Sequence, residues 1–218
     1  MLSFTEENYL KALLHLTIEL EHKNEAGTNE LASYLGVKPA TATDMLKKLK
    51  EKKLIAYEKY GKISLSETGR KKAIEILRKH RLWETFLYEK LDFTWDEVHE
   101  VAEQLEHIHS PKLVDKLDKF LGYPEFDPHG DAIPTANGEL KPSYKKSLSE
   151  AAEGVSCRMV GVKDNTVAFL KYVSQLDISL NTQIEVLSRQ PYDGSMEIQV
   201  GQKKLTVSQK FAENILIV

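Results

Sequence analysis

The chain has 218 residues, of which 41% are hydrophobic and 29% are charged, which is enough apolar material for one large domain or two to three small ones. This composition excludes a disordered tail and a disulfide-stapled miniprotein, and the single cysteine, Cys157, excludes internal disulfides and cysteine-based zinc clusters. The sequence shows neither a basic leader nor a long apolar run, so we expect a soluble, cytosolic protein without a membrane segment.

The net charge of −3 hides two oppositely charged regions. Residues 38–72 contain eleven Lys or Arg against four Asp or Glu, whereas residues 92–106 contain six acids and no Lys or Arg. Five of the seven histidines lie between His80 and His129. The first region predicts contact with a polyanion, and the second predicts metal binding by carboxylates and imidazoles.

The amino-terminal elements occur in the order of a winged helix. Apolar residues at a helical period predict helices at residues 4–23, 28–35 and 39–49, the last with Pro39 in its first turn. Strands are then predicted at residues 54–59 and 63–65, joined by a tight turn at residues 60–62, which together form a hairpin. The turn between the second and third helices resembles a helix-turn-helix.

The rest of the chain divides into a helical region and a β region. Amphipathic patterns predict helices at 66–91, 96–109 and 111–121, and their excess of apolar residues favours a homodimer interface over a second monomeric core, the alternative. Short alternating runs after residue 154 predict about five strands of a small β-barrel with one helix at 165–175. The fold class is therefore mainly α with a β carboxy-terminal domain. The predicted domains are 1–72 for DNA binding, 73–142 for metal binding and dimerisation, and 155–218 for the β-barrel, with residues 143–154 as a linker before the barrel.

The third helix predicts a surface that reads double-stranded DNA. Its leading residues are small or polar, which lets a backbone approach base edges in the major groove, and lysines beside them reach phosphates. The alternative is an ordinary solvated helix face. The positions expected to contact DNA are Pro39, Ala40, Thr41, Ala42, Thr43, Lys47, Lys48 and Lys50, with Lys59, Tyr60 and Lys62 of the hairpin.

Potential metal ligands cluster on two predicted helices. On helix 96–109, four of them are spaced i, i+4, i+7 and i+8, which places them on one helix face. A further pair, spaced i and i+4, lies on the preceding helix. Without a thiol, such ligands favour Mn²⁺ or Fe²⁺, although affinity alone favours Zn²⁺ or Cu²⁺; the alternative is an acidic solvent face with incidental histidines. The six residues are His99, Glu103, Glu106, His107, His80 and Glu84.

Several motifs together resemble the metal-dependent repressors of the diphtheria-toxin-repressor and manganese-transport-regulator family, in its long form with an SH3-like (FeoA-like) carboxy-terminal domain. The motifs are Glu6-Glu7-Asn8-Tyr9-Leu10, Lys38-Pro39-Ala40-Thr41, Leu65-Ser66-Glu67-Thr68-Gly69-Arg70, Arg78-Lys79-His80-Arg81-Leu82 and Val98–His107. The resemblance implies a primary metal site and a second site. The primary site comprises Asn8, Glu103, Glu106 and His107, and the second comprises His80, Glu84 and His99.

The resemblance also implies which metal to expect. Iron-responsive members have methionine and cysteine where this chain has Asn8 and Glu103, so manganese is favoured, with Fe²⁺ as the alternative and Zn²⁺ as a substitute in vitro. Lys11 stands where the short manganese regulators have glutamate, and an ammonium cannot ligate the second ion of their two-metal cluster. The loop 126–130 is similar to one that helps to complete the second site in longer members. The matching positions are Asp127, His129 and Asp164.

The implied function is a homodimeric repressor of metal-uptake genes, in which metal sets the spacing of two recognition helices on a palindromic operator. A rival from another class is a helical di-metal carboxylate enzyme, because Glu106 and His109 form a Glu-x-x-His motif. Such enzymes need two of these motifs, and the chain has one, so we expect no catalytic residues. A third interpretation makes the carboxy-terminal barrel a peptide-binding or purely structural module.

Overall fold

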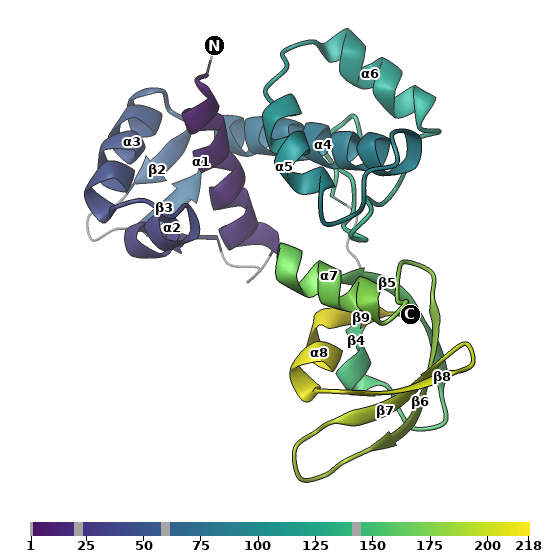
Figure 1. Ribbon diagram of the computed structural model, residues 1–218. Helices are drawn as coiled ribbons and strands as arrows, with labels where there is room; N and C mark the ends of the chain where they lie inside the picture. Colours follow the sequence, from purple (N-terminus) through teal and green to yellow (C-terminus); the bar gives the residue numbers. More distant parts are fainter. Residues whose placement is uncertain (1, 20–23, 58–61, 141–144) are drawn as a thin grey trace. The chain divides into compact units, whose positions relative to one another are not determined.

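The computed structural model describes residues 2–19, 24–57, 62–140 and 145–218. Figure 1 shows its helices and strands, and the chain divides into two compact units. The units alternate along the chain, and two of the boundaries between them fall within helices, after residues 80 and 103. Unit 1 comprises Met1–His80, Gln104–Ser110 and Pro134–Glu139, and unit 2 comprises Arg81–Glu103, Pro111–Ile133 and Leu140–Val218.

Helix α1 (Phe4–Leu14) begins at a capping box. The Ser3 hydroxyl accepts a hydrogen bond from the Glu6 backbone N–H, and the Glu6 carboxylate accepts one from the Ser3 backbone N–H. The helix continues as a π-helical turn, His15–Glu19, and the last predicted residues, 20–23, lie outside the described residues. Apolar residues that follow the helical period, among them Leu10, Leu13 and Leu14, are fully buried.

The predicted helix-turn-helix is confirmed by α2 (Thr28–Tyr34) and α3 (Pro39–Glu51). Gly36 adopts φ +64° in the turn between them, a conformation that costs glycine little. Helix α3 buries Ala42, Leu46 and Leu49 completely. The prediction that Ala42 belongs to the DNA-facing surface is therefore wrong, because the same period that exposes its neighbours turns this methyl group into the core.

The wing is a three-stranded antiparallel sheet of order β1-β3-β2 rather than a two-stranded hairpin. Strand β2 (Ile55–Tyr57) lies within its predicted run, and β3 (Lys62–Leu65) begins one residue before the predicted run 63–65. Strand β1 (Ala26–Gly27), which pairs with β3, is only two residues long and has no periodicity from which to predict it. The predicted turn residues before Lys62 lie outside the described residues.

The long helix α4 (Glu67–Lys90) and helix α6 (Pro111–Phe120) agree with the predicted ranges. Helix α5 (Val98–Leu105) is shorter than the predicted helix 96–109. Glu106 and His107 form a turn after it, because their buried side chains bond to other parts of unit 1. The expectation that four ligands share one helix face therefore fails for these two residues.

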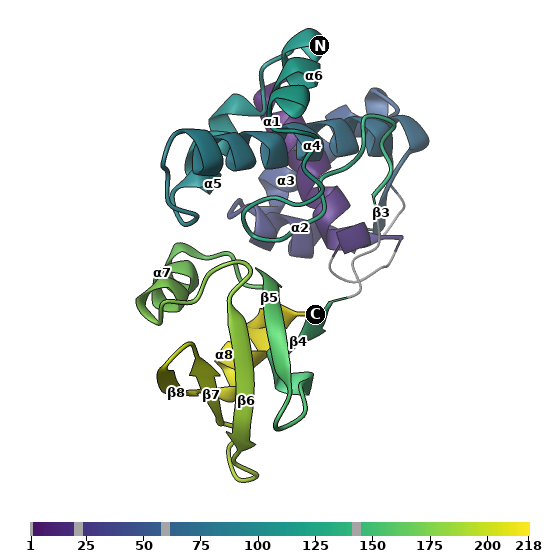
Figure 2. The same ribbon diagram turned by 90° about the vertical axis from the view of Figure 1, so that its right-hand side faces the viewer.

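The carboxy-terminal part of unit 2 is a six-stranded antiparallel sheet of order β4-β9-β5-β6-β7-β8 (Figure 2). The sequence predicted five strands and one helix; β4, which lies in the stretch predicted as a linker, and helix α8 are additional. Alternating apolar residues of the strands, including Met159, Ile184 and Ile198, form the core of this sheet. The elements are β4 (Lys146–Ser147), a 3-10 turn (Leu148–Glu150), β5 (Ser156–Val162), α7 (Val167–Gln175), β6 (Gln183–Arg189), β7 (Met196–Val200), β8 (Lys203–Val207), α8 (Gln209–Asn214) and β9 (Ile215–Ile217).

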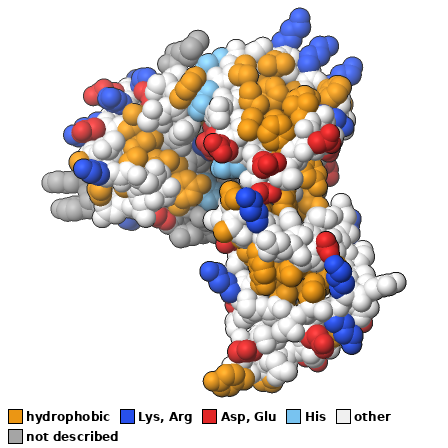
Figure 3. Space-filling view, viewed as in Figure 1, with side chains coloured by type: hydrophobic (Ala, Val, Ile, Leu, Met, Phe, Trp, Pro, Cys, Tyr) orange, Lys and Arg blue, Asp and Glu red, His pale blue; other side chains and the backbone are white. Residues whose placement is uncertain are grey.

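The helical part of unit 2 carries an apolar surface. Leu82 and Leu117 form a small core against which Trp83 and Phe86 are only partly buried, and Phe120 is 64% exposed. Figure 3 shows hydrophobic side chains gathered on the part of the surface that α6 occupies in Figure 1. Such a patch is typical of a protein–protein interface. Among the described residues, no helix is both long and apolar enough to cross a membrane.

Candidate metal centres and nucleic-acid interface

The exposed side of α3 carries most of the residues predicted to contact DNA. Pro39, Ala40 and Thr41 are exposed at its amino-terminal end, and Lys47 and Lys48 are exposed further along. Thr43 is half-buried, and its hydroxyl donates a hydrogen bond to the Pro39 carbonyl at 2.9 Å. A face of small side chains flanked by lysines is what a major-groove helix requires.

Two further lysines adjoin this face. Lys50 is exposed, and its ammonium donates a hydrogen bond to the Tyr57 carbonyl of β2 at 3.3 Å, which fixes the side chain against the wing. Lys62 at the start of β3 is exposed and pairs with Glu25 at 3.1 Å. The predicted contacts Lys59 and Tyr60 lie outside the described residues.

In unit 1, the carboxylate of Glu106 is completely buried and forms the centre of what we call the Glu106 cluster: Glu7, Asn8, Lys11, His80, Glu106 and His107. One oxygen, Oε2, accepts hydrogen bonds from Lys11 Nζ and His80 Nδ1, each at 2.7 Å. Burial alone would raise the pKa of Glu106, but the hydrogen bond from His80 and the charge of Lys11 outweigh it and hold the pKa below its ordinary value. Glu106 is therefore an ionised, buried carboxylate.

Two buried oxygens of this cluster have no hydrogen-bond partner among the described residues: Glu106 Oε1 and Asn8 Oδ1. Glu106 Oε1 lies 4.0 Å from His107 Nε2. Asn8 precedes Lys11 by three residues on α1, so the two share a helix face. Buried polar atoms are almost always satisfied. An orphaned oxygen of Glu106 near an imidazole nitrogen, with a second orphaned oxygen on Asn8, is a donor chemistry that suits a divalent cation.

Glu7 is a functional candidate that the sequence did not reveal. It is 3% exposed, and its Oε2 lies 2.6 Å from Nδ1 of His107. The motif Glu6-Glu7-Asn8 drew attention only to Asn8. No spacing in the sequence signals this contact, because Glu7 and His107 are 100 positions apart in the chain.

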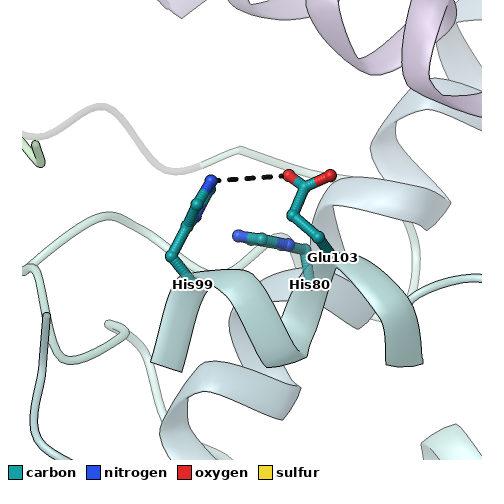
Figure 4. A group of neighbouring side chains, drawn as sticks. All are labelled: His80, His99 and Glu103. Carbon is teal, nitrogen blue, oxygen red and sulfur yellow. Dashed lines mark ion pairs between the residues drawn. The ribbon is translucent and has the colours of Figure 1, made fainter. Parts of the chain in front are cut away.

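In unit 2, His99 and Glu103 lie one turn apart on α5, with 3.6 Å between His99 Nε2 and Glu103 Oε1. Figure 4 shows these two side chains reaching toward each other; His80, the third residue drawn there, belongs to unit 1, where its partner is Glu106. His99 Nδ1 also lies 3.2 Å from Glu84 Oε1. The structure thus brings His99, Glu84 and Glu103 together within unit 2.

A second group in unit 2, the His129 cluster, comprises Glu84, Asp127 and His129, all buried. Each residue offers a ligand atom, and these atoms lie within 4.8 Å of one another. His129 Nδ1 faces Glu84 Oε2 at 3.6 Å, while its Nε2 bonds the Trp95 carbonyl at 2.8 Å. Asp127 Oδ2 is 3.4 Å from Nε of Arg81. The structure thus brings Asp127 and His129 together, and their role as metal ligands stays a prediction.

The loop that carries Asp127 and His129 is held firmly against strand β5. The His129 carbonyl accepts a hydrogen bond from the Val162 N–H at 3.1 Å. Gly130, at φ +83°, approaches the strand so closely that a Cβ atom would lie 1.8 Å from the Val160 carbonyl oxygen. Only glycine fits there, so the backbone fixes where His129 points.

The pKa values of two residues in the His129 cluster, Asp127 and His129, are both raised. Burial, together with the nearby charges of Asp131 and Glu84, raises the pKa of Asp127 to about 7. Burial alone would lower the pKa of His129, but the hydrogen bond and charge of Glu84 and the charge of Asp127 raise it to about 9. Near neutral pH His129 is therefore an imidazolium that neutralises its acidic neighbours.

Asp164, the remaining predicted ligand, is placed differently. It is half-buried, its Oδ1 accepts a hydrogen bond from the Thr166 N–H at 2.9 Å, and it precedes α7. It is not part of either group of neighbouring ligand atoms found among the described residues. Its role as a ligand stays a prediction, as does the grouping of Glu103 with the Glu106 cluster.

The helix-turn-helix with its cationic face, the wing and the two clusters of carboxylates and imidazoles define a class of protein: a winged-helix DNA-binding regulator with sites suited to divalent cations. Three family models match the chain in succession. They are the DNA-binding domain of iron-dependent repressors at residues 1–63, their metal-binding and dimerisation domain at 66–135, and the FeoA domain at 146–218.

Relatives and solved structures agree with these matches. An uncharacterized HTH-type transcriptional regulator from Methanocaldococcus jannaschii is 36% identical over 115 residues, which cover 53% of this chain and 90% of that protein. A manganese-dependent transcriptional repressor in complex with manganese has a TM-score of 0.83 at 31% identity, covering 98% of this chain and 99% of that one. ScaR with bound Cd²⁺ has a TM-score of 0.77 at 33% identity, with 98% of each chain covered.

Some curated relatives match over only part of their length. The iron-dependent repressor IdeR of Mycobacterium tuberculosis is 31% identical over 130 residues, 60% of this chain and 55% of IdeR. A probable metal transport system membrane protein from Chlamydia trachomatis is 42% identical over 71 residues, 33% of this chain but 16% of that protein.

The chain belongs to the family of metal-dependent transcriptional repressors that includes the diphtheria toxin repressor, IdeR and manganese-dependent repressors. The members of this family are DNA-binding repressors, which points away from catalysis.

Proposed function

We propose that the chain is a manganese-responsive repressor that binds double-stranded DNA as a homodimer and controls metal-uptake genes in the cytoplasm. The observation that carries the metal response is the pair of orphaned buried oxygens, Asn8 Oδ1 and Glu106 Oε1, in the cluster that also holds His107. An amide oxygen, a carboxylate oxygen and an imidazole nitrogen form a donor set suited to Mn²⁺ or Fe²⁺.

In this proposal Asn8, Glu106 and His107 hold the cation, with Glu103 as a further ligand implied by the family resemblance. A bound divalent cation supplies positive charge that the buried carboxylate needs. Asn8 lies on α1, which belongs to the winged-helix part, whereas Glu106 and His107 follow α5. These residues therefore join two segments about 100 positions apart in the chain, as the hydrogen bond between Glu7 and His107 already does.

The second proposed site is the His129 cluster, in which Glu84, Asp127 and His129 hold a cation when His129 gives up its proton. His99 is 3.2 Å from Glu84 and adjoins the same carboxylate. His80 and Asp164 are proposed as further members on the family resemblance alone. Loss of the imidazolium would leave two buried carboxylates, a charge that favours a divalent ion.

DNA recognition is proposed to use the exposed face of α3 on each half of a palindromic operator. Two recognition helices must then be about one turn of DNA apart, and the apolar surface around Trp83 and Phe120 is proposed as the dimer contact that sets this distance. Because coupling between sites is reciprocal, operator DNA should tighten metal binding by the factor by which metal tightens DNA binding.

The test begins with selection of a double-stranded DNA from a random pool by the purified protein in the presence of Mn²⁺. Binding of that DNA is then titrated with Mn²⁺, Fe²⁺ and Zn²⁺ under anaerobic conditions and followed by fluorescence anisotropy. We expect Mn²⁺ to tighten binding and a strong chelator to reverse it. DNA binding that is unchanged by chelation would contradict the proposal, and a stronger response to Fe²⁺ at equal free concentration would favour the iron-responsive alternative.

A further inference from the structure

Glu7 is a buried carboxylate that contacts two histidines and feels the nearby charge of Lys79. Its Oε2 is 2.6 Å from Nδ1 of His107, and its Oε1 is 3.5 Å from Nε2 of His109. The ring of Phe4 stacks on the His107 ring with 4.3 Å between centroids and 12° between planes. His107 is thus hydrogen-bonded at one ring nitrogen and stacked against an aromatic ring on one face.

The hydrogen bond to Glu7 decides which nitrogen of His107 can bind a cation. An ionised carboxylate only accepts hydrogen bonds, so Nδ1 must carry the hydrogen, and in the neutral imidazole the lone pair is then on Nε2. Nε2 is the atom that lies 4.0 Å from the orphaned oxygen of Glu106. A His107 with the opposite tautomer would present an N–H group to that position instead.

We infer that Glu7 is a positioning residue of the metal centre, which fixes the ring orientation and the tautomer of His107 without itself ligating the cation. This inference rests on the proposed function of the Glu106 cluster. Histidine ligands commonly donate their second N–H to a carboxylate, and removal of that partner typically costs about 10–100-fold in metal affinity. Both oxygens of Glu7 face histidines, so the role of a ligand falls to Glu106 Oε1 and Asn8 Oδ1.

The experiment compares Glu7→Ala and Glu7→Gln with a matched control, Glu6→Gln. Glu6 is the neighbouring buried carboxylate on the same helix, but its partner is Lys52, at 2.7 Å. The first readout is the pair of ¹⁵N chemical shifts of the His107 ring in metal-free protein, which report the tautomer. The second is the affinity for Mn²⁺, measured by isothermal titration calorimetry on the full chain.

The wild type should show a hydrogen on Nδ1 of His107. Glu7→Ala should shift the ring toward a hydrogen on Nε2 and weaken Mn²⁺ binding by about 10–100-fold. Glu7→Gln keeps an oxygen that accepts the Nδ1 hydrogen, so it should retain the wild-type tautomer and most of the affinity. Glu6→Gln should leave both readouts unchanged.

Three results would overturn the inference. A wild-type His107 with its hydrogen on Nε2 contradicts the orientation directly. An unchanged affinity in Glu7→Ala, with the fold intact by circular dichroism, shows that the bond is only structural. Equal losses in Glu7→Ala and Glu7→Gln show that Glu7 acts by its charge or as a ligand. If the wild-type protein binds no Mn²⁺, the proposed function fails instead, whereas the tautomer measurement still tests the role of Glu7.

Discussion

The Glu106 cluster and the His129 cluster both hold buried carboxylates, but they neutralise them differently. Glu106 bonds through Oε2 to the ammonium of Lys11, while its Oε1, the proposed ligand atom, has no partner among the described residues. Glu84 and Asp127 surround His129, which in the proposed second site becomes a ligand by losing a proton. We therefore expect the first cluster to bind a divalent cation beside a lysine that it keeps, and the second to exchange a proton for one.

The two clusters also differ in what they are connected to. The Glu106 cluster contains residues of α1, the helix whose Glu6 bonds Lys52 at the end of the recognition helix α3. The His129 cluster lies within unit 2, on a loop fixed to β5. We therefore expect the first cluster to control DNA binding and the second to tune it.

The largest predicted effect tests this difference directly. Glu106→Gln should abolish Mn²⁺-dependent DNA binding, with a loss of about 100-fold or more, because it removes the buried carboxylate that faces His107 Nε2. Asp127→Asn should cost about tenfold, since it alters the tuning site alone. Anaerobic anisotropy titrations of the two variants measure both. Equal losses of DNA affinity in the two variants would show that the two clusters control DNA binding together.

The next effect is the pH dependence of metal binding at the His129 cluster. Because the pKa of His129 is about 9 and that of Asp127 about 7, a cation bound above pH 7 displaces one proton. Affinity should therefore rise about tenfold per pH unit between pH 7 and 9, and fall more steeply below 7 as Asp127 is also protonated.

This dependence is best measured in the Glu106→Gln variant, in which the first cluster is disabled. Calorimetry in buffers of different ionisation enthalpy then gives the number of protons released. His129→Gln in the same background is the matched control and should lose the slope between pH 7 and 9. A flat profile in the variant that retains His129 would mean that the cation does not replace this proton.

A smaller effect in the opposite direction is expected from Lys11→Met. The change removes a positive charge 2.7 Å from Glu106, so Mn²⁺ should bind the first cluster roughly tenfold more tightly. The metal-free protein should lose about 1–3 kcal/mol of stability, because Glu106 is 0% exposed and loses one of its two hydrogen bonds among the described residues, that from Lys11. Thermal unfolding with and without Mn²⁺ measures both changes. Weaker Mn²⁺ binding would show that Lys11 supports the site rather than competing for it.

Long periodic segments could be predicted from the sequence, because burial on one face dictates their spacing. The sequence predicted α4 within a residue at each end, and α6 within a residue at its carboxyl end. The two-residue strand β1 and the six-residue helix α8 are too short to carry a period, so their partners in space decide their conformation.

The candidate site shows the same limit. The residue types of the candidate ligands and their approximate places could be predicted, since imidazoles and carboxylates are concentrated in one region of the chain; that they bind metal stays a prediction. The end of α5 at Leu105 could not, because the bonds of Glu106 and His107 to α1 override helical periodicity. Glu7 was missed for the same reason: its role depends on a residue 100 positions away, and no spacing in the sequence relates the two.

The smallest predicted effect concerns the link between the first cluster and DNA. Burial alone would raise the pKa of Glu6, but hydrogen bonding to Lys52 outweighs it and lowers the pKa, so the pair is charged. Lys52 is 45% exposed, and such partly solvated pairs contribute little to stability. Glu6→Gln should therefore weaken Mn²⁺-dependent DNA binding only about two- to fivefold, by loosening α1 from α3, and should leave Mn²⁺ affinity in the absence of DNA unchanged.

Lys47→Gln, which removes a charge on α3 without touching α1, is the control. It should weaken DNA binding to the same extent with and without Mn²⁺, in a salt-dependent manner. If Glu6→Gln behaves like Lys47→Gln, the link from metal to recognition helix runs through the dimer contact and not through α1.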